Sequence, residues 1–288
     1  MNERPSTIIQ WLQFAKSELP AYLEERERQN IASELLQRIL HKNRLELSIQ
    51  GYSEVSEELA ISLSKAIARL NLGEPLQYVT GISVFADLDL IVNHHVLIPR
   101  PETEELLHLV LNECKPNDHI LDIGTGSGCI PCLLKFKKPD IKIQAWDLCE
   151  AALAVAAENA RKYNLDIQFS QCDALAKWPE TDCQFDIIVS NPPYIPMGDK
   201  STIDAHVLDF EPQLALFAPE NDVLAFYRVI AEQGRYYLVS NGKVFLELNA
   251  DLAQDCHQLF EDYGYRNVQL HQDLQGKWRF LSAENIKF

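Results

Sequence analysis

The segment Asn191-Pro192-Pro193-Tyr194 combines hydrogen-bond acceptors with a rigid backbone, directly after an apolar strand-like run. Proline fixes its own φ and keeps the residue before it extended, so the segment holds one shape. Because neither proline nitrogen can donate a hydrogen bond, the side-chain oxygen of Asn191 and the carbonyl of Pro192 remain as outward acceptors. Two converging acceptors match the two hydrogens of one planar –NH2 group.

These acceptors favour attack by an amide or aryl amine nitrogen, which is a weak nucleophile because its lone pair is delocalised. Acceptors for both hydrogens favour a pyramidal nitrogen and bind more strongly as positive charge develops on it. Asn191, Pro192 and Tyr194 are therefore the candidate catalytic residues, and Pro193 joins them in the candidate substrate-binding segment. We expect Tyr194 to stack on the planar group. A plain Pro-Pro turn with a surface tyrosine is the alternative.

A glycine-rich run, Gly124-Thr125-Gly126-Ser127-Gly128, connects an apolar strand-like segment to a helix-like one. Glycines allow a tight turn and the close approach of a ligand. The spacing is G-x-G-x-G and not the G-x-G-x-x-G of pyrophosphate-binding sites. A methyl donor such as S-adenosyl-L-methionine carries no phosphate, and needs only a loop beneath its ribose and methionyl parts. The run therefore predicts a donor site, with a structural turn as the alternative.

Two further carboxylates follow strands of the same region. Asp147 lies about 20 residues after the first glycine, where a carboxylate can bind both ribose hydroxyls, although it can also cap a helix. Asp173 and Ala174 end a third strand, where an adenine ring would lie. Asp173 can accept from the adenine amine or can serve as a turn residue. The predicted reaction is methyl transfer from S-adenosyl-L-methionine, with S-adenosyl-L-homocysteine as the product.

The elements that position these residues alternate between strand and helix from about residue 118 onward. Strands are expected at 119–123, 141–146, 166–171, 185–190 and 243–248, and helices near 127–136, 149–163, 222–238 and 250–262. Such alternation gives a parallel sheet covered on both faces, and an antiparallel pair at 266–271 and 278–283 extends it. The predicted fold class is α/β, a Rossmann-like S-adenosylmethionine methyltransferase fold with a mostly parallel seven-stranded sheet.

Residues 1–75 differ, because their apolar residues recur at helical spacing without strand-like runs. One set runs from residue 59 to 70, opened by Ser56 and closed near Gly73. We expect a small all-helical N-terminal domain for substrate docking at 1–75, a linker with a hairpin-like segment at 76–105, and the catalytic domain at 106–288. In the linker, the two prolines of Ile98-Pro99-Arg100-Pro101-Glu102 predict an extended backbone.

The charge balance is acidic, with 26 Lys+Arg against 42 Asp+Glu and a net charge of −16. This field opposes a polyanion, so no direct nucleic-acid partner is expected. No uncharged apolar run reaches the ~18 residues of a membrane span, and the N-terminus does not resemble a signal peptide. We therefore expect no membrane association.

The seven cysteines, which include Cys183, are odd in number and favour a reducing, cytoplasmic location. The pair Cys129-x-x-Cys132 falls in an expected buried helix and has no second Cys/His pair at zinc spacing. We interpret it as core packing and predict no metal site. The chain is expected to be a monomer.

Taken together, these motifs resemble those of the protein-(glutamine-N5) methyltransferases that modify peptide chain release factors, the PrmC/HemK family. The resemblance covers nearly the whole chain. It rests on Glu74-Pro75-Leu76-Gln77-Tyr78-Val79-Thr80-Gly81, Val96-Leu97-Ile98-Pro99-Arg100-Pro101-Glu102-Thr103-Glu104, residues 121–130, residues 189–195 and Phe226-Tyr227-Arg228. The second of these together with Asn-Pro-Pro-Tyr is more specific than either alone.

The resemblance implies that the N-terminal helical domain docks a release factor, and that the glutamine of its Gly-Gly-Gln tip enters beside the donor. Residues 191–194 would hold that glutamine, while residues 124–128, Asp147, Ala174 and Asn191 would contact the donor. Two segments depart from the family pattern: Glu247-Leu248-Asn249 replaces Glu-Ile-Gly, and Pro219-Glu220-Asn221-Asp222-Val223 replaces a glycine-rich turn.

Other functions share parts of this pattern. Glutamine methylation of a large-subunit ribosomal protein and methylation of the adenine amine in DNA would also use Asn-Pro-Pro-Tyr. The DNA enzymes must flip a base and bind a polyanion, which an acidic chain fits poorly. A non-catalytic binding module with the same fold would show a damaged glycine loop or amide segment, and both are intact here.

Overall fold

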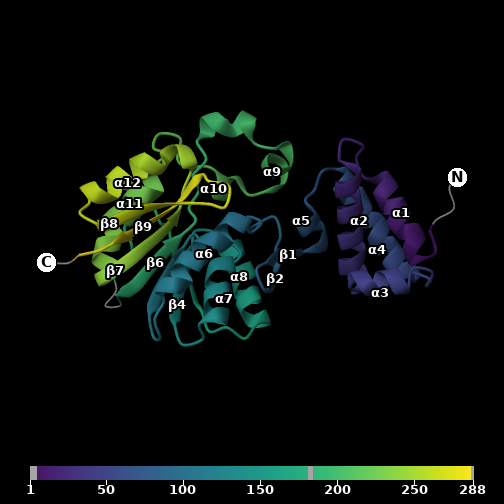
Figure 1. Cartoon of the computed structure of the whole chain (residues 1–288), viewed down its shortest axis with the longest axis horizontal. Helices are drawn as coiled ribbons and strands as arrows, with labels where there is room; N and C mark the ends of the chain where they lie inside the picture. The colour runs from purple at the N-terminus through teal and green to yellow at the C-terminus, as the bar shows by residue number, and fades with distance from the viewer. Residues whose placement is uncertain (1–4, 181–183, 287–288) are drawn as a thin grey trace. The chain divides into compact units, whose positions relative to one another are not determined.

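A computed structural model describes residues 5–180 and 184–286 of the chain (Figure 1), so that Cys183 lies outside the described residues. The chain divides into two compact units, Met1–Ile82 and Ser83–Phe288. Residues 76–82 of the expected linker thus group with the helical unit, and residues 83–105 group with the larger one. None of the described helices combines the length and apolar character that crossing a bilayer requires.

The smaller unit consists of helices, as the spacing of its apolar residues predicted. These are α1 (Ile8–Glu18), α2 (Glu25–Leu40), α3 (Arg44–Ile49), α4 (Glu57–Asn71) and α5 (Leu76–Thr80). Trp11, Leu35 and Leu63 are fully buried where the helices meet. The side chain of Ser56 accepts a hydrogen bond from the Leu59 amide at 3.4 Å, so it caps α4 as expected.

The larger unit is built on a seven-stranded sheet in the order β5-β4-β3-β6-β7-β9-β8. Its strands are β3 (His119–Ile123), β4 (Lys142–Asp147), β5 (Gln168–Gln171), β6 (Phe185–Ser190), β7 (Leu238–Glu247), β8 (Arg266–Gln272) and β9 (Trp278–Glu284). The first five are parallel, while β9 runs antiparallel to both β7 and β8. This confirms the predicted fold class.

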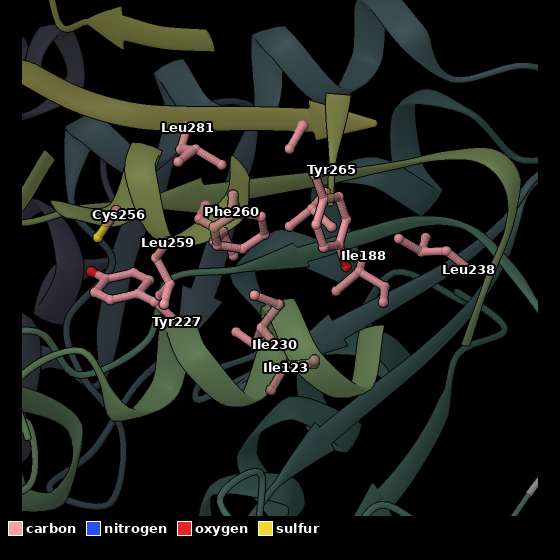
Figure 2. Packing of buried hydrophobic residues seen from close by; sticks show 14 of the residues in the cluster. Ile123, Ile188, Tyr227, Ile230, Leu238, Cys256, Leu259, Phe260, Tyr265 and Leu281 are labelled. Atoms are coloured by element: carbon pink, nitrogen blue, oxygen red, sulfur yellow. The ribbon is translucent and has the colours of Figure 1, made fainter. Parts of the chain in front are cut away.

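Helices cover both faces of this sheet (Figure 1). One face packs against α6 (Pro101–Glu113), α7 (Cys129–Lys137) and α8 (Glu150–Lys162), and the other against α11 (Ala225–Tyr237) and α12 (Ala253–Asp262). Adjacent residues of a strand point to opposite faces, so in β6 Ile187 packs toward the α6 side and Ile188 toward the α11 side. Figure 2 shows Tyr227, Phe260 and Leu281 within the cluster on the α11 side.

Several short elements complete the larger unit. A hairpin of β1 (Ile82–Phe85) and β2 (Leu88–Ile91) turns at Ala86, which has a φ of 47°. The 3-10 helix η1 (Met197–Thr202) and the helices α9 (Ala205–Phe210) and α10 (Gln213–Leu216) lie between β6 and α11, and a second 3-10 helix, η2 (Ala250–Leu252), precedes α12. The sequence did not predict η1, α9 and α10, because helices this short show little periodicity.

The extended backbone expected at 98–102 ends at Arg100, because Pro101 is the first residue of α6. The prediction was therefore wrong for Pro101 and Glu102. Proline is well tolerated in the first turn of a helix, where its missing N–H leaves no hydrogen bond unmade. The helix that begins there carries Thr103 toward the carboxyl edge of the sheet, which matters for the site described below.

Candidate functional site

A cavity of about 370 Å³ lies in the larger unit, at the carboxyl edge of its sheet. Its wall comes from the loops that follow β3, β4, β5 and β6, from the chain that precedes α6, and from α10. Ligands of open α/β sheets bind in the crevice at this edge. The size is that of a site for a small ligand or cofactor.

Most of the sequence-predicted site residues line this cavity. They are Gly124, Thr125, Gly126, Ser127, Asp147, Asp173, Ala174, Asn191 and Pro193. Gly128, Pro192 and Tyr194 are not part of the wall, and Pro192 is buried. A Cβ atom added to Gly128 would lie 3.0 Å from the Cβ of Ala156. This glycine therefore permits close packing of the loop on α8.

The glycine loop is bound tightly to the end of the neighbouring strand. The amides of Gly124 and Thr125 both donate to the carbonyl of Trp146 at 2.9 Å. Gly124 and Gly126 adopt φ values of 75° and 53°, in the left-handed region that favours glycine. A Cβ atom added at either position would meet no atom within 4 Å, so open space borders the loop.

Asp147 connects this loop to helix α8. Its Oδ2 accepts from the Gly126 amide at 2.8 Å, and its Oδ1 accepts from the Cys149 amide at 2.9 Å. Burial raises the pKa of its carboxyl, and these backbone donors oppose the rise. Asp147 is not the cap of α8, however, because the N-cap residue is Cys149 and Asp147 accepts from the amide of that residue itself. The helix-cap alternative was therefore wrong. Each carboxylate oxygen retains a further lone pair for a ligand.

Beneath the loop lies a group of buried polar atoms without hydrogen-bond partners among the described residues. They are both carboxylate oxygens of Asp122 and the hydroxyls of Thr125 and Ser127. Burial raises the pKa of Asp122 to about 7, although the nearby Thr125 hydroxyl opposes the rise and the charge of Asp147 adds to it. Native proteins rarely leave so much polar capacity unused away from a binding site.

Asp173 serves as a turn residue in the loop after β5. Its Oδ1 accepts from the Leu175 amide at 2.9 Å, while the residue also lines the cavity. The carbonyl of its neighbour Ala174 accepts from the indole Nε1 of Trp178 at 2.9 Å, which anchors the loop to the core. The turn alternative is thus realised, and a contact with adenine stays a prediction.

Asn191 belongs to a hydrogen-bonded chain of side chains that reaches a buried glutamate. Its Nδ2 donates to Thr103 Oγ1 at 3.0 Å, and that hydroxyl donates to Glu247 Oε2 at 2.8 Å. The phenol of Tyr194 donates to Glu247 Oε1 at 3.1 Å, and its ring packs against the core. Burial and the charge of Glu247 raise the pKa of Tyr194, so the phenol keeps its proton.

The sequence assigned no role to Thr103 or Glu247. A signal for Glu247 was present, since this carboxylate ends an otherwise apolar strand at the edge where ligands bind. The parallel register pairs Ser190 with Leu246, so the residues that follow, Asn191 and Glu247, emerge side by side. Thr103 gave no comparable signal, because it lies in a helix that the sequence did not predict.

Two further buried residues, which were not predicted from the sequence, connect segments that border the cavity. The amide of Asn159 donates to the carbonyls of Ser127 and Ile91 at 2.9 Å and accepts from the Ile91 amide at 2.6 Å. It thereby fastens the β1–β2 hairpin to the glycine loop. Glu211 accepts from Arg100 Nη2 at 2.6 Å and from the Ile98 amide at 3.1 Å, which fastens α9 to the chain before α6.

The two cysteines of the Cys-x-x-Cys pair lie in α7, and Cys132 is fully buried in the core. Burial raises the pKa of the Cys129 thiol to about 12, so it stays protonated at neutral pH. Within residues 5–180 and 184–286, no three His, Cys, Asp or Glu side chains are grouped to hold a metal ion.

Two known domain families match the chain. The "PrmC N-terminal domain" matches residues 10–81, and the "Methyltransferase small domain" matches residues 102–208. A solved structure described as "Crystal structure of Methyltransferase from Pyrococcus furiosus" aligns with a TM-score of 0.53 and 20% identity. It covers 78% of this chain and 100% of that chain, and shows the fold alone.

Relatives that match most of the chain are more similar in sequence. A protein of Bacteroides thetaiotaomicron named "Release factor glutamine methyltransferase" is 43% identical over 77% of this chain and 80% of its own length. One of Lactococcus lactis with the same name is 41% identical over 87% of this chain and 93% of its own length. The chain therefore belongs to the family of release factor glutamine methyltransferases.

Proposed function

We propose that this chain transfers the methyl group of S-adenosyl-L-methionine to the side-chain amide nitrogen of the glutamine in the Gly-Gly-Gln motif of peptide chain release factors. The observation that carries the proposal is the placement of Asn191. Its side chain lies in the wall of the same cavity as the glycine loop and Asp147, with its –NH2 already bound to Thr103. Its Oδ1 has no hydrogen-bond partner among the described residues, and is available to a substrate.

The residues around the cavity fit S-adenosyl-L-methionine. Open space borders Gly124 and Gly126, and Asp147 has lone pairs left for two ribose hydroxyls. Thr125 and Ser127 also belong to the cavity wall, beside the glycines of the loop. We assign the adenine to the loop after β5, where Ala174 and Leu175 offer apolar side chains and Asp173 a polar one to the cavity. Bound there, the donor supplies an electrophilic methyl group on a sulfonium sulfur.

The chain's own contribution is to bind and orient the amide nitrogen. The Asn191 Oδ1 accepts one of its hydrogens, and we assign the second to the Pro192 carbonyl, which lies between two wall residues in the sequence. Both hydrogen bonds strengthen as positive charge develops on the nitrogen, so they stabilise the transition state more than the ground state. No strong base is needed, because the methylated amide nitrogen is acidic and loses its proton to water.

The substrate follows from the family. The names of the relatives describe enzymes that act on release factors. The PrmC N-terminal domain matches the smaller unit of this chain, and the Methyltransferase small domain matches part of the larger one. We infer that Met1–Ile82 docks the release factor while Ser83–Phe288 performs the transfer. The acidic net charge of −16 agrees with a protein substrate better than with DNA.

The test is incubation of the purified chain with methyl-labelled S-adenosyl-L-methionine and a recombinant release factor. A second release factor, with glutamate in place of the Gly-Gly-Gln glutamine, is the matched control. A large-subunit ribosomal protein fraction and adenine-containing duplex DNA form two further arms. Label on the first factor alone is the expected result. Label confined to the ribosomal proteins or the DNA would overturn the assigned substrate.

A further inference from the structure

Glu247 is a buried carboxylate that serves the site without touching its cavity. It is 1% exposed and ends β7 beside the end of β6. A buried carboxylate is unfavourable unless it is hydrogen-bonded or paired. The nearby cation Arg279 pairs with Asp273 instead, at 3.4 Å. Both side-chain oxygens of Glu247 accept from hydroxyl groups, those of Thr103 and Tyr194.

These contacts decide which way the Asn191 amide points. An asparagine side chain has a donor end and an acceptor end of nearly equal shape, and either end fits most sites sterically. A threonine hydroxyl has one hydrogen. When Glu247 is ionised, Thr103 gives that hydrogen to the carboxylate, so the Thr103 oxygen can only accept from Asn191. The –NH2 of Asn191 must therefore face Thr103, which leaves its oxygen for the cavity.

We propose that Glu247 is a positioning residue that orients Asn191 through Thr103, so that an acceptor and not a donor meets the substrate. The reverse orientation would place the Asn191 –NH2 against the –NH2 of the incoming amide, and the two donors would repel. The inference rests on the proposed function for the identity of the substrate. The orientation of the Asn191 amide itself follows from the side-chain contacts alone.

The second oxygen of Glu247 holds the other end of the same segment. The phenol of Tyr194 donates to it, and the Glu247 carbonyl accepts from the phenol of Tyr227 at 3.2 Å. One glutamate thus holds the first residue of the Asn-Pro-Pro-Tyr segment indirectly and its last residue directly. The two hydroxyls contact different oxygens of Glu247, so glutamine in the same arrangement would present its oxygen to one hydroxyl and its –NH2 to the other.

The experiment compares Thr103→Val, Thr103→Ser and Glu247→Gln in steady-state methylation of a recombinant release factor, with donor affinity measured by calorimetry. Thr103→Val keeps the shape and removes the hydroxyl. We expect its kcat to fall by about 100-fold, on the scale of a misplaced catalytic contact, with donor Kd changed less than about 2-fold. Thr103→Ser should restore most of the activity. Loss of donor affinity equal to the loss of kcat would overturn the proposal.

Glu113→Gln is the matched control. Glu113 pairs with Lys243 and so connects the same helix and strand, α6 and β7, but away from the cavity. A merely structural connection between α6 and β7 would make this variant as inactive as Glu247→Gln. We expect unchanged kcat for Glu113→Gln and a kcat about 10-fold lower for Glu247→Gln, which keeps one of its two hydrogen bonds.

A double variant tests whether Glu247 acts through Thr103. If the two residues act in series, Thr103→Val combined with Glu247→Gln should lose little more than Thr103→Val alone, because the relay is already broken. If the fold-losses of kcat in the two single variants multiply in the double variant, Glu247 acts independently of Thr103. That result would overturn the proposal that Glu247 orients Asn191 through Thr103.

A substrate-free measurement separates this inference from the proposed function. The side-chain –NH2 resonances of Asn191, assigned by their absence in Asn191→Asp, should shift in Thr103→Val and in Glu247→Gln but not in Glu113→Gln. Resonances that stay in place in the first two variants would overturn the positioning role. An inactive wild type with the expected resonance shifts would instead refute only the glutamine substrate.

Discussion

The free energy of unfolding should decrease between pH 5 and pH 7, and replacing Glu247 by glutamine should remove part of that decrease. Burial raises the pKa of Glu247 from 4.5 to about 7. Hydrogen bonds from Thr103 and Tyr194 and the charge of Arg279 oppose the rise, while Glu102 adds to it. Tyr227 and Cys129 also face Glu247, but burial keeps both protonated over this pH range.

The sign follows from which state holds the proton more tightly. Because the pKa of Glu247 is higher in the folded protein, the folded state binds the proton at pH values where the unfolded chain has released it. The associated stability is complete below the unfolded pKa of 4.5 and is lost as pH rises to about 7. At about 1.4 kcal/mol per pKa unit, the loss is about 3 kcal/mol.

The assay is urea unfolding of the wild type and of Glu247→Gln at pH 5 and pH 8, followed by near-ultraviolet circular dichroism. The wild type should lose about 3 kcal/mol more than the variant between the two pH values. Asp122, whose pKa is also raised to about 7, is present in both proteins and cancels from the difference. Equal losses in the two proteins would refute the reasoning that Glu247 is a carboxylate destabilised by burial.

Three further substitutions test the site. Asn191→Ala should lower kcat by about 100-fold, the scale seen when a hydrogen-bonding group used in the transition state is lost, with donor Kd less affected; unchanged turnover would contradict its role. Asp147→Ala should weaken donor binding by about 10-fold to 100-fold in calorimetry, because a charged acceptor is lost, and an unchanged Kd would count against the ribose contact. Gly128→Ala should destabilise the fold by about 1–3 kcal/mol in thermal unfolding, and more than Gly126→Ala, because only the first brings its new Cβ to 3.0 Å from Ala156. Equal effects of the two glycine substitutions would show that backbone strain alone decides the cost.

The strands of the sheet could be predicted well, because each strand is visible in the local pattern of apolar residues. The runs at 119–123 and 185–190 are mostly apolar and match β3 and β6 residue for residue. The glycine loop and Asp147 follow such strands directly, so their place at the carboxyl edge could be predicted as well. The start of α6 was missed, although a proline at the first helical position with Glu102 and Glu104 in the first turn is itself a helix-start signal.

The hydrogen-bonded chain from Asn191 to Glu247 could not be predicted from the sequence, for a different reason. Thr103 and Glu247 are 144 residues apart in the chain and meet only because α6 packs beside the end of β7. Tyr194 was expected on the planar group, and in the structure its phenol binds Glu247 while the ring packs in the core. The direction of a side chain depends on such tertiary contacts, and a sequence motif alone does not contain them.

The bond network of Asn159 has a consequence for the entropy of ligand binding. One buried amide joins the carbonyl of Ser127, in the glycine loop, to both backbone polar groups of Ile91 in the hairpin. The loop therefore becomes ordered when the protein folds, since any displacement must break these hydrogen bonds or move β2 with it. A ligand that binds against the loop meets an already immobilised backbone, and its affinity is not reduced by the need to order that backbone.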